Sequence, residues 1–126
     1  MTKLKKKTLK MKNWAVVGAT DDKSRFGYKI VKILKENDYN VYPVNPKKDK
    51  VAGIRCYNKL SEIENKIDVV DFVINPQIGK NIIEEVAELD IEYVWLQPGS
   101  RSDEIRDYAK DYNIKIIEDC IYATLK

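Results

Sequence analysis

Histidine is absent from this chain of 126 residues, and its absence excludes several classes of function. Without an imidazole there is no histidine general base, no triad that uses one, no histidine metal ligand and no phosphohistidine intermediate. The chain has two cysteines, Cys56 and Cys120, which lie far apart in the sequence. Their spacing matches neither a zinc site nor a CxxC redox site, and it supports no disulfide framework.

Long apolar runs are also missing. Apolar residues make up 44% of the chain, but no run approaches the ~20 residues that span a bilayer. The first residues lack the apolar segment of a secretory signal peptide. These absences predict a soluble, cytoplasmic protein, and the length predicts one domain around a single core.

The net charge of +3 is unevenly distributed, because six lysines lie in the first twelve residues. We therefore predict a lysine-rich arm over residues 1–12 and a mildly acidic domain over residues 13–126. Such an arm can contact nucleic acid or an acidic surface. No aromatic or arginine residue is interleaved with the lysines, which favours a solvated arm or a short leading helix packed through Leu4, Leu9 and Met11.

From Asn13 onward, strand-like runs alternate with helix-length segments of mixed polarity. This alternation predicts an α/β fold, with a doubly wound parallel sheet of Rossmann-like topology. Right-handed crossovers give the strand order 3-2-1-4-5-6 and a crevice between the first and fourth strands. The predicted strands are 14–17, 40–44, 54–57, 69–74, 93–96 and 114–117, and the predicted helical segments are 28–37, 60–63, 78–89 and 102–112.

The segment NWAVVGATDDKSRFG, residues 13–27, joins an apolar strand to a glycine turn and a helix. Such a junction presents backbone N–H groups and the positive end of a helix dipole to an anion. Eight residues separate Gly18 from Gly27, so the spacing is not the dinucleotide fingerprint GxGxxG. Asn45 stands where an NAD enzyme usually has an acidic ribose ligand. The longer loop suggests a ligand other than NAD, although a purely structural turn stays open.

Six ordered blocks extend this pattern over residues 14–120: AVVGAT with SRFGYKI, VYPVNPK, GIRCYNKLSEI, IDVVDFVINP, VWLQPG and IIEDC. On these motifs the chain resembles the small stand-alone CoA-binding proteins that are related to the CoA-binding domain of succinyl-CoA synthetase. The resemblance implies a Rossmann-like domain that binds CoA. The resemblance also implies that the synthetase transfers energy through a phosphohistidine in a separate domain. A chain without histidine cannot form that intermediate. The chain departs from the family pattern at Pro98 within the QxG turn, in the segment after Cys120, which is uncharged until the final lysine, and in the dense N-terminal lysines.

The candidate CoA ligands follow the predicted strands. Thr20, Ser24 and Arg25 offer donors to phosphate, while Lys47 suits the 3′-phosphate of CoA, or that of NADP, better than NAD. Turn or cap roles for Thr20 and Ser24 and a plain surface role for Lys47 stay open. The predicted cofactor-binding residues are Gly18, Ala19, Thr20, Ser24, Arg25, Gly27, Asn45, Pro46, Lys47, Asn75, Pro76, Gln97 and Gly99.

These features together predict a non-catalytic protein that binds CoA or acyl-CoA, with no catalytic residues and no metal. One alternative is an NADP-dependent oxidoreductase-like nucleotide-binding protein, although one small domain offers little room for a substrate pocket and a proton donor. A second alternative is a nucleic-acid-associated protein that uses the basic arm. A protein partner or a homo-oligomer stays open.

A few other residues have structural and functional interpretations. Asp71 interrupts an apolar strand and is interpreted as a structural, hydrogen-bonded carboxyl group, because an unpaired buried carboxylate is costly. Cys120 follows the last strand, where it is either a packing residue or a group that meets the ligand thiol. Cys56, Trp14 and Trp95 are predicted packing residues.

Overall fold

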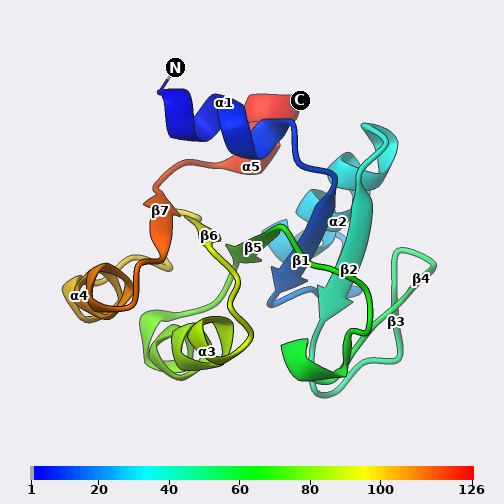
Figure 1. The fold of residues 1–126 in the computed structure, drawn as a ribbon. Coiled ribbons are helices and arrows are strands. Elements are labelled where there is room, and N and C mark those ends of the chain that lie inside the picture. The colour runs from blue at the N-terminus through cyan, green and yellow to red at the C-terminus, as the bar shows by residue number, and fades with distance from the viewer. Residues whose placement is uncertain (1) are drawn as a thin grey trace.

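A five-stranded parallel sheet, in the order β2-β1-β5-β6-β7, lies at the centre of the computed structural model, which describes residues 2–126 (Figure 1). The α/β class and the parallel sheet predicted from the sequence are confirmed. The strands are β1 (Asn13–Val17), β2 (Asn40–Val44), β3 (Lys50–Val51), β4 (Ile54–Arg55), β5 (Val69–Phe72), β6 (Tyr93–Leu96) and β7 (Lys115–Ile117). The helices are α1 (Lys3–Leu9), α2 (Phe26–Glu36), α3 (Pro76–Glu88), α4 (Asp103–Asp111) and α5 (Ile121–Leu125), with a 3-10 turn η1 (Leu60–Glu62).

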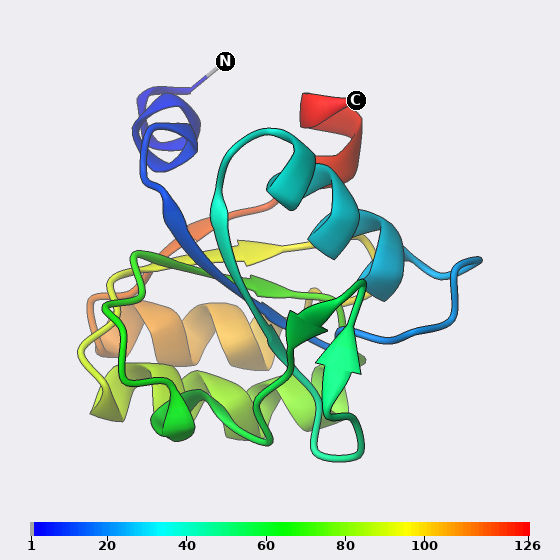
Figure 2. The same ribbon diagram turned by 90° about the vertical axis from the view of Figure 1, so that its right-hand side faces the viewer.

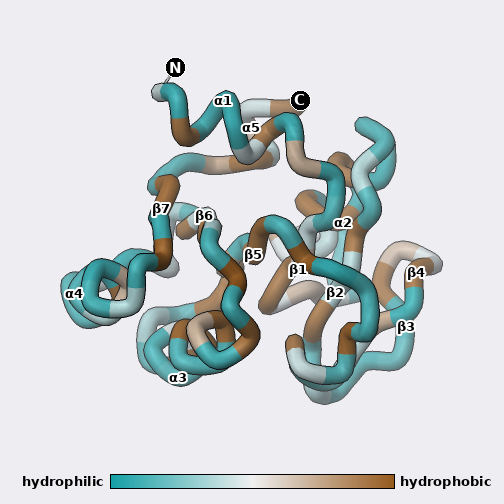
Figure 3. Tube along the Cα trace, viewed as in Figure 1, coloured by the Kyte–Doolittle hydropathy of each residue, from teal (hydrophilic) through white to brown (hydrophobic). Residues whose placement is uncertain are grey.

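Two helical layers cover the two faces of the sheet. Figure 2 shows α1, α2 and α5 above the sheet and α3 and α4 below it. Successive strand residues alternate between these layers, so Trp14 and Val16 join the core under α2, while Ala15 and Val17 join the core over α3 and α4. Because both faces are covered, the strands are apolar almost throughout. Hydrophobic segments accordingly gather at the middle of the molecule, and the outer side of α4 is hydrophilic (Figure 3).

The predicted strand order 3-2-1-4-5-6 was wrong at its first position. Only Tyr57 of the predicted third strand pairs with the main sheet, through an isolated parallel bridge to Val44. The preceding residues form an antiparallel hairpin between β3 and β4 instead. Ala52 and Gly53, at φ 50° and 78°, connect the two strands, and two central residues with positive φ are typical of a tight hairpin turn. A local turn therefore replaces most of the long-range pairing.

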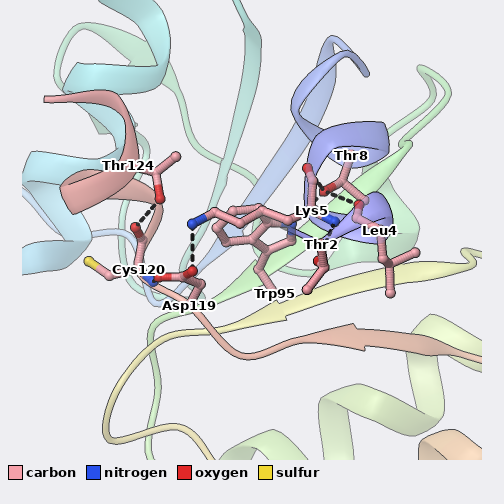
Figure 4. Close-up of polar contacts among 8 residues, drawn as sticks. All are labelled: Thr2, Leu4, Lys5, Thr8, Trp95, Asp119, Cys120 and Thr124. Carbon is pink, nitrogen blue, oxygen red and sulfur yellow. Dashed lines mark hydrogen bonds and ion pairs between the residues drawn. The ribbon is translucent and has the colours of Figure 1, made fainter.

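The N-terminal helix α1 is attached to the sheet by specific contacts (Figure 4). Thr8 is fully buried, and its hydroxyl accepts a hydrogen bond of 2.9 Å from the indole N–H of Trp95. Lys5 forms an ion pair with Asp119, which holds the pKa of that carboxyl group below its usual value. Leu4, Leu9 and Met11 pack against the core, as the alternative of a short leading helix predicts. The proposed division at residues 12 and 13 thus separates segments that are in contact, and residue 1 lies outside the described residues.

Thr8→Val is expected to lower the free energy of unfolding by about 1–3 kcal/mol, because it leaves the buried indole N–H of Trp95 without an acceptor. Chemical denaturation measures this change. Thr124→Val is the matched control, since the Thr124 hydroxyl donates to the carbonyl four residues earlier, as that of Thr8 does, but accepts no indole N–H in the described part of the chain. Equal losses in the two variants would contradict the role given to the Thr8–Trp95 bond.

None of the helices in residues 2–126 has the length and apolar character needed to cross a bilayer.

Candidate functional site

A cleft of about 640 Å³ opens at the carboxyl ends of the strands. It lies over the junction of β1 and β5, where the chain leaves neighbouring strands toward opposite faces of the sheet. Ligands of open α/β sheets bind at this switch point, and the sequence predicted the crevice there. The lining residues are Gly18, Thr20, Arg25, Phe26, Gly27, Asn45, Val73, Ile74, Asn75, Ile78, Gln97, Pro98, Gly99, Ser100 and Cys120.

Two glycines shape the floor of the cleft. Gly18 has φ +96°, and a Cβ at this position would overlap the Val73 carbonyl oxygen and lie 2.8 Å from the Ile74 side chain. A Cβ on Gly27 would overlap the Gly18 carbonyl oxygen. The first turn of α2 therefore packs directly on the glycine turn. The N–H groups of Phe26 and Gly27 have no hydrogen-bond partner among the described residues, and both residues line the cleft.

The loop between these glycines is exposed and partly self-bonded. The Asp22 side chain accepts hydrogen bonds from the Ser24 N–H at 3.0 Å and from the Ser24 hydroxyl at 2.6 Å. These bonds lower the pKa of Asp22 below its usual value. Thr20 accepts the Asp22 N–H at 3.2 Å. Ser24 is thus engaged by Asp22 and does not line the cleft, whereas Thr20 and Arg25 do.

Asn45 connects the loops that follow β1 and β2. Its side-chain amide donates to the Ala19 carbonyl at 2.7 Å, and its side-chain oxygen accepts the Lys47 N–H at 2.8 Å. The first bond joins the two loops, and the second closes a turn within the loop after β2. Ala19 is buried beneath the cleft, while Pro46 and Lys47 are exposed and lie outside its lining. Lys47 has no ion pair with any described residue.

The opposite wall is built by α3 and the turn after β6. Asn75 caps α3 by accepting the Ile78 N–H at 3.0 Å, and Pro76 occupies the first turn of that helix outside the lining. The Ser100 hydroxyl donates to the Ile74 carbonyl at 2.6 Å, and its oxygen accepts the Ile74 N–H at 3.1 Å. This pair of bonds joins the loops after β5 and β6. Gly99 and Pro98 are exposed at the rim.

A buried acid lies behind this wall. Asp71 is fully buried, and the Gln97 side chain donates to one of its oxygens at 2.6 Å. Burial raises the pKa of Asp71 to about 8, against the smaller opposing effect of the Gln97 bond. The other Asp71 oxygen and the Gln97 side-chain oxygen have no hydrogen-bond partner among the described residues. A neutral Asp71 is a hydrogen-bond donor, which agrees with the structural interpretation of this residue.

The two cysteines are unpaired and differ in environment. Cys120 is half-buried at the N-terminus of α5 and lines the cleft. Cys56 is buried, and burial is the main cause that raises the pKa of its thiol. Trp14 and Trp95 are fully buried and in edge-to-face contact, as predicted for packing residues.

Eight of the thirteen predicted ligand residues line the cleft: Gly18, Thr20, Arg25, Gly27, Asn45, Asn75, Gln97 and Gly99. The structure does not bring the other five, Ala19, Ser24, Pro46, Lys47 and Pro76, into the lining. Phe26, Ile78 and Ser100 line the cleft but were missed as site residues. Phe26 and Ile78 lie in the first turns of helices that follow predicted ligand-binding loops. Their closeness to those loops in the sequence was the one feature that could have indicated them. The Ser100 contact joins two loops 26 residues apart and gives no local signal.

The residues present suit the binding of an anion. Arg25 is the one charged side chain among the described residues that line the cleft, and the N-termini of α2 and α3 both open on it. Residues 2–126 contain no group of three or more His, Cys, Asp or Glu residues that could hold a metal ion. The arrangement can hold and orient a phosphate-bearing ligand.

Comparisons with known proteins agree with this geometry. A family model described as "CoA binding domain" matches residues 12–126. The chain is 31% identical over 114 residues to an ADP-forming acetate–CoA ligase of Methanocaldococcus jannaschii, a match that covers 84% of this chain and 16% of the ligase. It is also 31% identical over 111 residues to the uncharacterized protein YneT of Bacillus subtilis, covering 87% of this chain and 82% of that protein. The chain thus spans about a sixth of the ligase and most of YneT.

Solved structures share the fold. A hypothetical protein from Pyrococcus horikoshii superposes with a TM-score of 0.90 at 30% identity, covering 95% of this chain and 85% of that chain. A conserved hypothetical protein from Pyrococcus furiosus superposes with a TM-score of 0.84 at 31% identity, covering 90% of this chain and 99% of that chain. Both likenesses extend over nearly the whole described chain.

Proposed function

The chain belongs to the CoA-binding domain family, and from this premise we propose that it binds CoA non-catalytically in the cleft described above. The observation that carries the proposal is the junction of Gly18 and Gly27. There the backbone at the floor of the cleft has no room for a side chain, and the first turn of α2 opens beside Arg25. Free N–H groups, a helix dipole and a guanidinium are suitable donors for a pyrophosphate.

Three features of the residues in and beside the cleft suit CoA. The glycine cradle admits the close backbone approach that a pyrophosphate needs. Asn45 replaces the acidic ribose ligand expected of an NAD site, and both its polar atoms are already engaged. Lys47 is exposed directly after β2, on the side where the ribose of a nucleotide lies in this fold. A side chain of its length can reach a 3′-phosphate from outside the cleft lining.

The proposal of a non-catalytic role is supported by the residues that line the cleft. The chain has no histidine, and Arg25 is the one charged side chain that the described lining offers. Asp71, the carboxyl group with a strongly raised pKa, is fully buried behind Gln97 and does not reach the cleft. Binding without turnover is the function that these groups support best.

A thermal-shift panel of CoA, dephospho-CoA, NAD, NADPH and a generic oligonucleotide tests the proposal. CoA at 100 times its Kd is expected to stabilise the chain by about 2.7 kcal/mol, and NAD is expected to have no effect. If NADPH stabilises the chain and CoA does not, the oxidoreductase-like alternative is favoured. If only the oligonucleotide stabilises the chain, binding of nucleic acid through the lysine-rich segment is favoured. No response to CoA at any concentration would reject the proposal.

Lys47→Ala is expected to weaken CoA binding by roughly 1–3 kcal/mol, since it removes a charge-assisted contact to the 3′-phosphate. The same substitution is expected to leave the affinity for dephospho-CoA unchanged. Lys48→Ala is the matched control, because it removes the neighbouring exposed lysine. Titration calorimetry of the three proteins with both ligands gives the comparison. An unchanged affinity for CoA in Lys47→Ala would return Lys47 to a plain surface role.

A further inference from the structure

The cleft is chemically divided along the order of the strands. The half over β1 and β2 contains Thr20, Arg25 and Asn45, which bear polar or charged groups. The half over β5, β6 and the start of α5 is lined mainly by apolar groups and a thiol. These lining residues are Phe26, Val73, Ile74, Ile78, Pro98 and Cys120.

Two residues of the apolar half are unusually exposed. Phe26 is 51% exposed and Ile78 is 49% exposed, and they belong to a set of four large hydrophobic side chains with high exposure among the described residues. The other two, Leu89 and Tyr112, lie at the C-terminal ends of α3 and α4, outside the cleft lining. Single exposed apolar side chains are common on protein surfaces. Two in one cleft, joined to further apolar lining, indicate a surface that a ligand covers.

Phe26 and Ile78 approach this half of the cleft from opposite faces of the sheet. Phe26 begins α2 and packs edge-to-face on Tyr122 of α5, with ring centroids 5.8 Å apart. Ile78 lies in the first turn of α3, in the other helical layer. The apolar half is therefore bounded on both sides by apolar side chains that are about half exposed.

Three polar side chains line this half, those of Asn75, Gln97 and Ser100, and each forms at least one hydrogen bond within the protein. The Ser100 hydroxyl bonds to both the N–H and the carbonyl of Ile74. Gln97 is 3% exposed, and its amide donates to Asp71. Ser100 is also 3% exposed, so apart from Asn75 the side-chain surface that this half offers a ligand is mostly apolar. An aliphatic group is the complementary occupant of such a surface.

We propose that this apolar half receives the acyl chain of a short aliphatic CoA thioester. The inference rests on the proposed binding of CoA, and it names acylated CoA as the preferred ligand class. With the ribose beside β2 and the pyrophosphate over Gly18, the strand order β2-β1-β5-β6 directs the pantetheine arm toward β6 and Cys120. The thioester and its acyl chain then lie between Phe26 and Ile78.

Titration calorimetry with CoA, acetyl-CoA, butanoyl-CoA and hexanoyl-CoA tests the inference. Full burial of a methylene corresponds to about a fourfold gain in affinity, and an open cleft covers only part of each. We expect about a twofold gain per methylene, which is on the order of tenfold between acetyl-CoA and hexanoyl-CoA. Ile78→Ala is expected to flatten this dependence when each acyl-CoA affinity is expressed relative to that of free CoA for the same variant. Leu89→Ala, which truncates an exposed apolar residue at the other end of α3, is the matched control. It is expected to keep the dependence of affinity on chain length.

The outcomes separate the two claims. Binding of free CoA with equal affinity for all four ligands would overturn the acyl inference and leave the proposed function in place. Failure of all four ligands to bind would overturn both. An equal slope in Ile78→Ala and the wild-type chain would assign the chain-length effect to some other surface and reject the inference.

Discussion

Gly18→Ala is expected to lower the free energy of unfolding by about 2–5 kcal/mol, as measured by urea denaturation. A residue with a Cβ loses roughly 1–2 kcal/mol in the left-handed region, and Gly18 has φ +96°. Overlap of the new methyl group with the Val73 carbonyl oxygen and the Ile74 side chain adds an overpacking cost of about 1–3 kcal/mol. The glycine turn and residues 73–74, which the methyl group would strain, both line the cleft, so CoA affinity is expected to fall as well.

Gly53→Ala separates the two causes. Gly53 also has a positive φ, +78°, but a Cβ there would meet nothing within 4 Å. The free energy of unfolding of this variant is expected to fall only by the conformational cost, about 1–2 kcal/mol. The variant is expected to bind CoA as the wild-type chain does. A Gly18→Ala chain that loses no more stability than Gly53→Ala would contradict the close packing of the turn against β5.

The second large effect concerns Asp71 and pH. The pKa of Asp71 is raised to about 8 in the folded chain, whereas an unfolded aspartate has a pKa of about 3.9. Between these values the folded state holds a proton that the unfolded state has released. The stability from this group is therefore complete below pH ~4 and lost as the pH rises toward 8, with a slope of about −1.4 kcal/mol per pH unit. Its strand neighbours Val16 and Trp95 do not titrate.

Asp71→Asn is expected to remove this slope, so the variant should become more stable than the wild-type chain as the pH approaches 8. Urea denaturation at several pH values between 4 and 9 measures the difference. Asp107→Asn, which removes an exposed carboxylate on α4, controls for the loss of one negative charge. Parallel pH profiles for Asp71→Asn and the wild-type chain would show that Asp71 does not hold a proton in the folded state.

The parts of the fold that were predicted from the sequence depend on local patterns. Continuous apolar runs identify strands buried on both faces, as in β5 and β6, and the glycine turn after β1 locates the switch point. The β3–β4 hairpin was missed because a two-residue turn at Ala52 and Gly53 competes with pairing to β2. Helix α5 is only five residues long and has no side-chain cap, so it carries little helical signal in the sequence.

The site was predictable where a residue follows a strand directly. Gly18 and Asn45 directly follow β1 and β2, Asn75 directly follows the predicted strand 69–74, and all three line the cleft. Ser24 does not line it, because a hydrogen bond to Asp22 engages its hydroxyl. The contact of Ser100 with Ile74 depends on how two distant loops pack. Such contacts are set by tertiary structure, and the spacing of residues in the sequence does not reveal them.

Chemical-shift mapping of a CoA titration by ¹⁵N NMR tests the central claim most directly, because it reports where CoA binds as well as whether it does. The largest amide shifts are predicted at residues 18–27, 75–78 and 97–100, at the carboxyl edge of the sheet, with small shifts in α1 and α4. The largest shifts in α1, or no saturable shifts at all, would contradict binding of CoA in this cleft.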